Sequence, residues 1–206
     1  LIGANDGTQF INFGDTDDTN VGEINYDHST NKMNFRTNDA YAMVIDGAGH
    51  TTKPLQPYVW AYRNADQTMT ANDADEKVEL NALHYDVNSD FNTSNNTFTA
   101  PVSGVYMVNC SWKIIGDLNS NITDMFFKLG ASNGDETINT LNPQAIQVST
   151  ASNFTVLING SRPLFMDAND TLIMEADAYS NGTHQYTLDG GNNARQTTNM
   201  IIYLLG

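Results

Sequence analysis

The side chains best suited to chemistry in this sequence are carboxylates, and they gather in turns. Three acidic turns stand out: GDTDDTNVGE (14–23), TANDADE (70–76) and DANDT (167–171). An EF-hand calcium loop needs acids at alternate positions, Gly at position six and Glu at position twelve, and none of the three turns has that pattern. Strand-linking turns, in which Asp and Asn hydrogen-bond their own backbone, are therefore the favoured interpretation. Calcium held by carboxylates pooled at a subunit junction is the alternative.

Zinc binding and catalysis find less support in the sequence. The four histidines, His28, His50, His84 and His184, share no ligand spacing, and the single cysteine, Cys110, lies in an apolar run that predicts a buried, inert thiol. Neither a nucleophile elbow nor a Gly-rich phosphate loop occurs. Paired carboxylates are expected by chance in so acidic a chain. The sequence predicts a protein that is not an enzyme and has no metal site or cofactor, calcium apart.

Composition and charge narrow the class of protein. The 206 residues include 24 acidic and 9 basic side chains, a net charge of −15, so clustered basic residues for binding nucleic acid are missing. The chain is rich in Asn, Thr, Gly and Ser, which favour turns over helix interiors and predict an all-β protein. No signal peptide and no apolar stretch of about 20 residues is present. Because the chain begins with Leu1 rather than Met, we expect an upstream part that carries targeting or assembly functions.

Residues 1–50 contain apolar pairs two residues apart between polar turns, a pattern that predicts short strands. Isolated short hairpins are marginal in water, so this segment is expected to fold only with partner chains. Three identical chains wound together would supply the missing walls of a core. The predicted interface residues here are Ile24, Tyr26, Met33 and Phe35.

Longer strands are predicted after a linker at residues 51–56. They cover residues 57–64, 77–83, 96–100, 105–115, 124–131, 145–158, 171–178 and 199–205, with 184–188 doubtful and NGSRP (159–163) among the turns. About eight strands without a helix indicate a β-sandwich or jelly roll. VYMVNCSWKII (105–115) and NMIIYLL (199–205) are apolar on both faces, so they need cover on both sides. The opposite sheet covers one side, and a neighbouring subunit is the natural cover for the other.

FNTSNNTFTAPVSGVY (91–106) resembles the signature of the globular head of complement subcomponent q, which shares a superfamily with tumour necrosis factor. Phe91, Phe98, Pro101, Gly104 and Tyr106 match that signature in order and spacing. SRPLFMDANDTLIMEAD (161–177) and NMIIYLLG (199–206) look like the family's later turn and last strand. The resemblance covers about residues 57–206 and implies a ten-strand jelly roll that assembles as a tight trimer about a threefold axis.

The same resemblance implies roles for individual side chains. The jelly-roll core would contain Phe98, Gly104, Tyr106, Val108 and Trp112. Met107 and Asn109, on the alternate face of their strand, would look toward the threefold axis. For the last strand, the parity that faces the axis is left open.

FINFGDTDDTNVGEINYDHSTNKMNFRTNDAYAMVIDGAGH (10–50) resembles a unit repeated in phage tail-fibre and other virion appendage proteins. Its pattern is F-G-D, an acidic turn, G-x-I-x-Y-x-H, N-x-M-x-F and M-x-I-D-x-x-G, and it implies an intertwined three-stranded β shaft. The predicted fold class is therefore all-β: a short intertwined β shaft (1–50) followed by a jelly-roll β-sandwich head (57–206), homotrimeric.

Together the two resemblances imply an extracellular virion fibre or spike whose trimeric head binds a host cell-surface glycan or envelope protein. Its upstream part would contact other virion proteins. The alternatives are a structural decoration of a virion or filament without a receptor, and a secreted recognition protein like complement subcomponent q. Aromatic and amide side chains suit sugar faces and hydroxyls, which makes two loops, 86–97 and 179–195, the candidate receptor sites. The candidate residues are Tyr85, Phe91, Asn95, Tyr179, His184, Tyr186 and Arg195.

Overall fold

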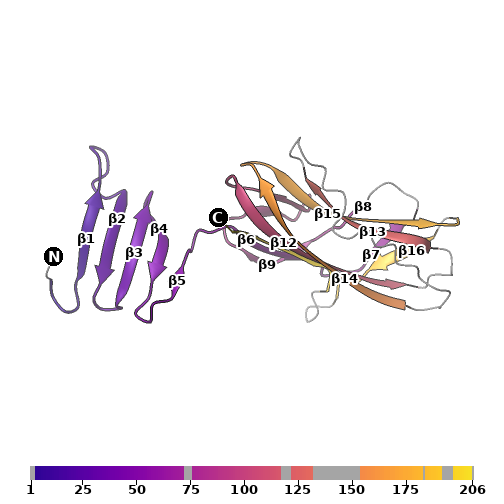
Figure 1. The fold of residues 1–206 in the computed structure, drawn as a ribbon, viewed down its shortest axis with the longest axis horizontal. Helices are drawn as coiled ribbons and strands as arrows, with labels where there is room; N and C mark the ends of the chain where they lie inside the picture. The colour runs from indigo at the N-terminus through magenta and orange to yellow at the C-terminus, as the bar shows by residue number, and fades with distance from the viewer. Residues whose placement is uncertain are drawn as a thin grey trace. The chain divides into compact units, whose positions relative to one another are not determined.

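A computed structural model describes residues 3–71, 76–116, 122–131, 154–182, 184–191 and 197–205. Every regular element in these ranges is a β-strand, so the all-β class predicted from composition is confirmed. Within the same ranges, no helix is long and apolar enough to cross a membrane. The chain divides into two compact units, Leu1–Gln56 and Pro57–Gly206 (Figure 1). Predicted strand residues 145–153 and the candidate Arg195 lie outside the described residues.

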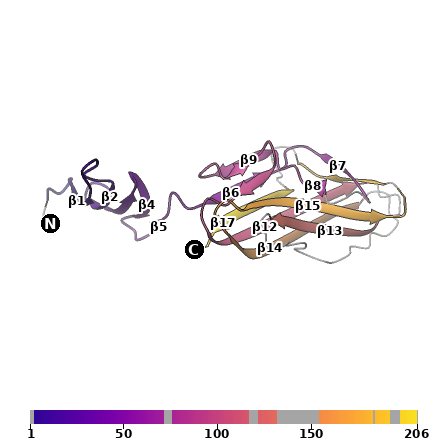
Figure 2. The same ribbon diagram turned by 90° about the horizontal axis from the view of Figure 1, so that it is seen from above.

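The first unit is a single antiparallel sheet whose strands follow one another in sequence order, and Figure 2 shows it nearly edge-on as one layer. Its strands are β1 (Thr8–Phe13), β2 (Gly22–Asp27), β3 (Lys32–Thr37), β4 (Ala40–Ile45) and β5 (Thr51–Thr52). Tight turns join β2 to β3 and β3 to β4, where Asn31, Asn38 and Asp39 adopt the positive φ angles that Asn and Asp tolerate. Neighbouring strands of this sheet pair with one another within the chain.

The two faces of this first sheet differ in polarity. The cross-strand register aligns eight apolar residues on one face, which we call the shaft face. They are Ile11, Phe13, Ile24, Tyr26, Met33, Phe35, Met43 and Ile45. On the opposite face Glu23, Asn25 and Asn34 are buried, and the Asn34 amide donates to Asn25 Oδ1 at 2.7 Å. No apolar side chain is buried among the described residues of this unit, because a single layer has nothing to cover its shaft face.

The second unit is a sandwich of two antiparallel sheets (Figures 1 and 2). The β12 sheet has the order β7-β16-β12-β17-β6-β9, with β14 also paired to β12. Its strands are β6 (Tyr58–Tyr62), β7 (Gln67–Thr70), β9 (Ala82–Asp86), β12 (Gly104–Gly116), β14 (Phe154–Met166), β16 (Gln185–Leu188) and β17 (Asn199–Leu204). The β15 sheet has the order β10-β11-β15-β13, with β8 also paired to β15. Its strands are β8 (Glu76–Lys77), β10 (Phe91–Asn92), β11 (Thr97–Thr99), β13 (Ile122–Ala131) and β15 (Thr171–Ser180).

The hydrophobic core of this unit contains side chains of both sheets. Aromatic contacts bridge the elements: Phe98 meets Tyr106 with ring centroids 5.6 Å apart, and Trp112 meets Phe127 at 5.4 Å. The Tyr106 hydroxyl donates to the Val102 carbonyl at 2.7 Å, so its one polar group is satisfied at the edge of the core. Of the residues predicted to lie in the core, Phe98, Tyr106, Val108 and Trp112 are fully buried, and Gly104 is partly buried at the start of β12.

Three details of the predicted strands are wrong. The segment NGSRP (159–163), predicted as a turn, lies inside β14, where Gly160 pairs with Cys110 and Pro163 with Met107. β12 is the partner strand of β14 in the described part of the chain, and an edge strand tolerates Pro because its missing N–H breaks no ladder bond on the open side. The predicted strand 77–83 is in fact split between β8 and β9, and β7 was not predicted.

We predict that Trp112→Ala lowers the free energy of unfolding by about 3–5 kcal/mol, because it removes a fully buried side chain and leaves a cavity beside Phe127. Urea denaturation followed by circular dichroism measures the change. Val102→Ala, at an exposed position next to the same strand, is the control and should change stability by less than about 0.5 kcal/mol. An equally small loss for Trp112→Ala would show that the core is not built around this residue.

Candidate interaction surface

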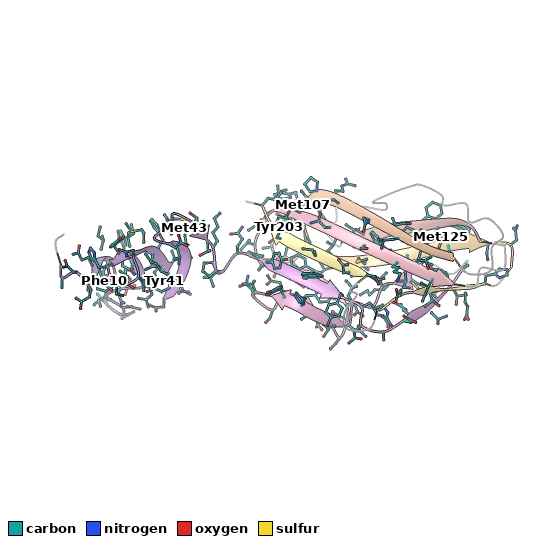
Figure 3. All side chains as sticks on the ribbon, turned by 90° about the horizontal axis from the view of Figure 1, so that it is seen from below. Phe10, Tyr41, Met43, Met107, Met125 and Tyr203 are labelled. Atoms are coloured by element: carbon teal, nitrogen blue, oxygen red, sulfur yellow. The ribbon has the colours of Figure 1, made fainter. Side chains whose placement is uncertain are left out.

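The side of the β12 sheet that points away from the core is itself largely apolar. On β12 the even-numbered side chains from Tyr106 to Ile114 are buried and the odd-numbered ones are partly exposed. Buried and partly exposed side chains also alternate on β6, where the odd-numbered ones are buried, and on β17, where Met200 and Ile202 are buried. Cross-strand register places Met107 beside Tyr203 and Tyr203 beside Tyr58, and Figure 3 shows Met107 and Tyr203 close together on this unit. We call this surface the outward face. Its residues are Tyr58, Trp60, Tyr62, Val105, Met107, Asn109, Ser111, Lys113, Ile115, Thr155, Leu157, Asn159, Ser161, Pro163, Phe165, Asn199, Ile201 and Tyr203.

Aromatic rings cluster toward β6 and β9 on this face. The ring centroids of Tyr58 and Tyr203 lie 6.4 Å apart, and those of Tyr58 and Tyr85 lie 6.0 Å apart in an edge-on arrangement. Trp60 and His84 are closer, at 4.5 Å. On the far side of β12, Phe165 is 58% exposed. Contiguous apolar surface is the kind of feature that interaction sites share.

Charge is depleted on the outward face. None of its residues is a carboxylate, although the chain has 24 acidic side chains, and Lys113 is the one charged residue among them. The Lys113 ammonium donates to Asp189, from the segment after β16, and neutralises it. Burial by itself would raise the pKa of Asp189, but the hydrogen bonds from Lys113 and the Gly191 N–H outweigh it and lower that pKa. Depletion of charge is the compositional mark of an interface core.

The residues predicted to lie at a trimer interface can now be placed. Met107 and Asn109 lie on the outward face, where Ile201 and Tyr203 of the last strand join them, while Met200 and Ile202 are in the core. In the first unit, Ile24, Tyr26, Met33 and Phe35 all lie partly buried on the shaft face. Their contact with other copies stays a prediction.

The predicted receptor residues divide into exposed and buried groups. Tyr85 on β9 and Tyr179 on β15 are each about half exposed, Asn95 is exposed in the turn between β10 and β11, and His184 is partly buried just before β16. Tyr85 and Tyr179 belong to different sheets, so the structure does not join the two loops into one site through them. Tyr179 contacts Phe126 with ring centroids 5.6 Å apart.

Two of the receptor predictions are wrong because the side chains are buried. Phe91 is 5% exposed and lies opposite Phe98 in the short β10–β11 pairing, where it covers the edge of the core. Tyr186 is 1% exposed and lies opposite Met69 between β16 and β7. Both residues stand in polar sequence that resembles a loop, yet each is part of a strand only a few residues long. A side chain that is covered by its own chain cannot contact a receptor.

The acidic turns of the first unit use their carboxylates to hold the backbone. Asp27 accepts hydrogen bonds from the Ser29 N–H at 2.9 Å, from the Ser29 hydroxyl at 2.6 Å and from the Thr30 hydroxyl at 2.6 Å. These bonds favour the ionised form and lower the pKa of Asp27 to about 2. Asp15 accepts in the same way from the N–H groups of two later residues. Across the described ranges no three His, Cys, Asp or Glu side chains are arranged to hold a metal ion, while residues 72–75 of the turn 70–76 lie outside them.

Comparisons with known proteins bear on the fold. No family model and no curated protein matches the chain. Among solved structures, that of Eiger TNF from S. frugiperda matches with a TM-score of 0.50 and 13% identity, covering 73% of this chain and 94% of that one. The globular domain of the zebrafish complement 1qA protein matches with a TM-score of 0.49 and 17% identity, covering 73% of this chain and 98% of that one.

The chain contains a TNF-like jelly roll. The likeness is one of fold alone at this level of identity, and it confirms the jelly-roll fold that the signature at residues 91–106 predicted. The last strand, β17, lies between β12 and β6 inside its sheet. No comparison covers the shaft resemblance, which stays a prediction.

We predict that the Asp27 carboxyl stays ionised down to about pH 2 in the folded protein, as its hydroxyl and N–H donors stabilise the anion. Its pKa is below the ordinary value of 3.8, so its contribution to stability is complete above about pH 4 and disappears as the pH falls through 2. Carboxyl ¹³C NMR titration measures the midpoint. Ser29→Ala with Thr30→Ala should move the midpoint up toward the ordinary value, and a wild-type midpoint near 4 would contradict the turn geometry.

Proposed function

We propose that this chain is the distal part of an extracellular homotrimeric fibre or spike of a virion, and that its jelly-roll head recognises a molecule on a cell surface. The observation that carries the proposal is the carboxylate-free, apolar outward face in a chain of net charge −15. Such a face needs cover, and the chain's own second sheet covers only the other side. A neighbouring head supplies that cover, and the resemblance at residues 91–106 implies three heads around an axis.

The first unit supports the same assembly through an independent requirement. Its shaft face is apolar, whereas the side chains it buries are polar. A sheet of one layer leaves Ile24, Phe35 and their neighbours only partly buried, which limits their hydrophobic stabilisation. Three shaft faces turned toward a common axis would make the missing core. Residues 10–50 resemble repeats of virion appendage proteins, and for this reason we propose that the assembly is a fibre.

Recognition of another molecule would fall to the surfaces that the assembly leaves in water. Loops on a rigid scaffold usually carry binding, and Tyr179 and Asn95 are exposed on or beside the β15 sheet, away from the outward face. Tyr85 contacts the rim of the outward face through Tyr58, so it would lie beside the interface between copies. Because the chain is strongly acidic, we propose a neutral glycan or a cationic envelope protein as the ligand. The role is binding rather than catalysis, without a cofactor.

One observation favours the second candidate function, a structural fibre that recognises no receptor. The burial of Phe91 and Tyr186 removes two of the aromatic side chains that would have stacked on a sugar. What is left is a scattered set rather than a concave aromatic site. A fibre that only decorates or stabilises a particle needs the trimer but not the loops. The two functions therefore differ in the behaviour of the loops and agree on the assembly.

We predict that light scattering of the full chain gives one species of three times the chain mass, unchanged by a calcium chelator. Met107→Glu places a carboxylate on the outward face of each copy and should convert the protein to monomers, because like charges would be buried together. Thr99→Glu, exposed on β11 of the other sheet, is the matched control and should stay trimeric. A monomeric wild type would overturn the fibre proposal, and dissociation by chelator would show that the acidic turns bind calcium after all.

We predict that Tyr179→Ala weakens binding to cells or to a glycan array by roughly 5- to 30-fold, the effect of losing about 1–2 kcal/mol from an aromatic contact. Tyr41→Ala is the matched control, since Tyr41 is about as exposed but lies in the first unit. The full chain is tested as a trimer against neutral and sialylated glycans, and in competition with whole particles. If the wild type binds no glycan and does not compete, the structural-fibre function is the correct one.

A further inference from the structure

A belt of amides and hydroxyls interrupts the apolar outward face. Asn109 and Ser111 of β12 lie opposite Ser161 and Asn159 of β14, and Ser111 also lies opposite Asn199 of β17. These five neighbouring residues, which we call the polar belt, line a hollow of about 350 Å³ on the outward face. No member carries a charge. The belt is therefore a neutral polar patch that is set into a sheet surface otherwise suited to burial.

Apolar residues flank the belt in both directions along the strands. Toward the start of β12, the next row contains Met107, Pro163 and Tyr203. In the other direction, Leu157 lies opposite Lys113, whose charge is neutralised by Asp189. The belt thus differs in chemistry from the residues on either side of it. A displacement of two residues along the strand would replace polar side chains of the belt by apolar ones.

Hydrogen bonding within the belt is incomplete in a single chain. The Ser161 hydroxyl donates to Asn109 Oδ1 at 2.7 Å. Within the described part of the chain, nothing accepts from the Asn109 amide nitrogen, and the side chains of Ser111 and Asn159 have no protein partner. Water satisfies these groups while the face is open. Once the face is covered, each of them needs a partner from the covering molecule or from water trapped in the hollow.

We propose that the polar belt fixes the register in which copies of this chain meet through their outward faces. This inference rests on the proposed homotrimer and adds the device that makes it a single, defined assembly. Hydrophobic attraction is non-directional, so an outward face that was apolar throughout would allow copies to slide past one another. With the belt present, only the aligned register pairs amide with amide. A slipped register buries unpaired donors, which is costly.

A second copy of this chain is the occupant that the chemistry of the belt fits best. An amide offers both donors and an acceptor, so identical belts are complementary to each other without any change of residue. The absence of carboxylates from the outward face removes direct charge repulsion between copies of an acidic chain. A single polar residue set into an apolar seam specifies register in coiled coils at some loss of stability, and the belt would act on the same principle in a sheet.

The test uses the full chain with a spin label at Thr99→Cys, an exposed position on the other sheet; Cys110 is buried and will not compete for the label. Pulsed electron resonance then measures label-to-label distances between copies. We expect the wild type to give one narrow set of distances. Asn109→Val with Ser161→Val should remain assembled by light scattering but give a broadened or multiple distribution, because the slipped registers no longer leave these donors unpaired.

Two further variants complete the test. Asn109→Thr with Ser161→Thr retains hydroxyls on a strand-favouring residue and should keep the distribution narrow. Asn12→Val with Thr8→Val, a matched exposed pair on β1, should leave it unchanged. A belt variant with the wild-type distribution would overturn the inference, because the belt would then not determine the register. A belt variant that dissociates to monomers would also overturn it, because the belt would then supply affinity instead. A wild type that is itself monomeric, with no distances between copies, would overturn the proposed assembly and the belt's role with it.

Discussion

Pairing of β12 along both of its edges is the interaction on which the second unit depends. β14 accompanies it from Gly104 opposite Met166 to Gly116 opposite Phe154, while β17 and β16 share the other edge. Because successive side chains of a strand point to opposite faces, this one strand determines both the core and the outward face. A slip of one residue would turn Lys113 inward and Trp112 outward. The core therefore holds the register of the sheet, and with it the composition of the surface on the other side.

The strands predicted from the sequence match the structure where the hydrophobic pattern and the local turn chemistry agree. Apolar pairs bounded by Asp, Asn and Gly located the strands of the first unit, and the signature from Phe91 to Tyr106 located the start of β12. The prediction failed where a strand forms only because a distant segment pairs with it. β14 crosses NGSRP because thirteen residues of β12 offer it hydrogen bonds, and β10 and β16 bury Phe91 and Tyr186 within polar sequence. Pairing between distant segments overrides local propensity in these cases, and no local signal reports it.

The first unit pairs polar groups within one chain but leaves its apolar side chains without full burial. Its backbone groups are paired strand to strand, and its polar side chains bond one another: Asn34 donates to Asn25, Asn25 to Glu23, and Arg36 lies 3.9 Å from Glu23. These polar groups are thus paired within one chain, whereas none of the apolar side chains described in this unit is buried. The hydrogen-bonded polar side chains lie on one face of the sheet, and the apolar side chains of the shaft face lie on the other. What this unit lacks is a surface to cover the shaft face, which is the one thing that another copy of the same sheet could provide.

Charge decides which surfaces of so acidic a protein can meet. At physiological ionic strength the Debye length is about 8 Å, so carboxylates that face each other across a contact still repel, while those farther away are screened. No residue of the outward face is a carboxylate that could face another across a contact. Its one charged residue, Lys113, is neutralised by Asp189. Asp15 and Asp27 are examples of acidic residues that lie in the first unit instead, where they accept hydrogen bonds that hold the backbone of turns. Two outward faces can therefore meet without bringing carboxylates of their own residues into direct opposition.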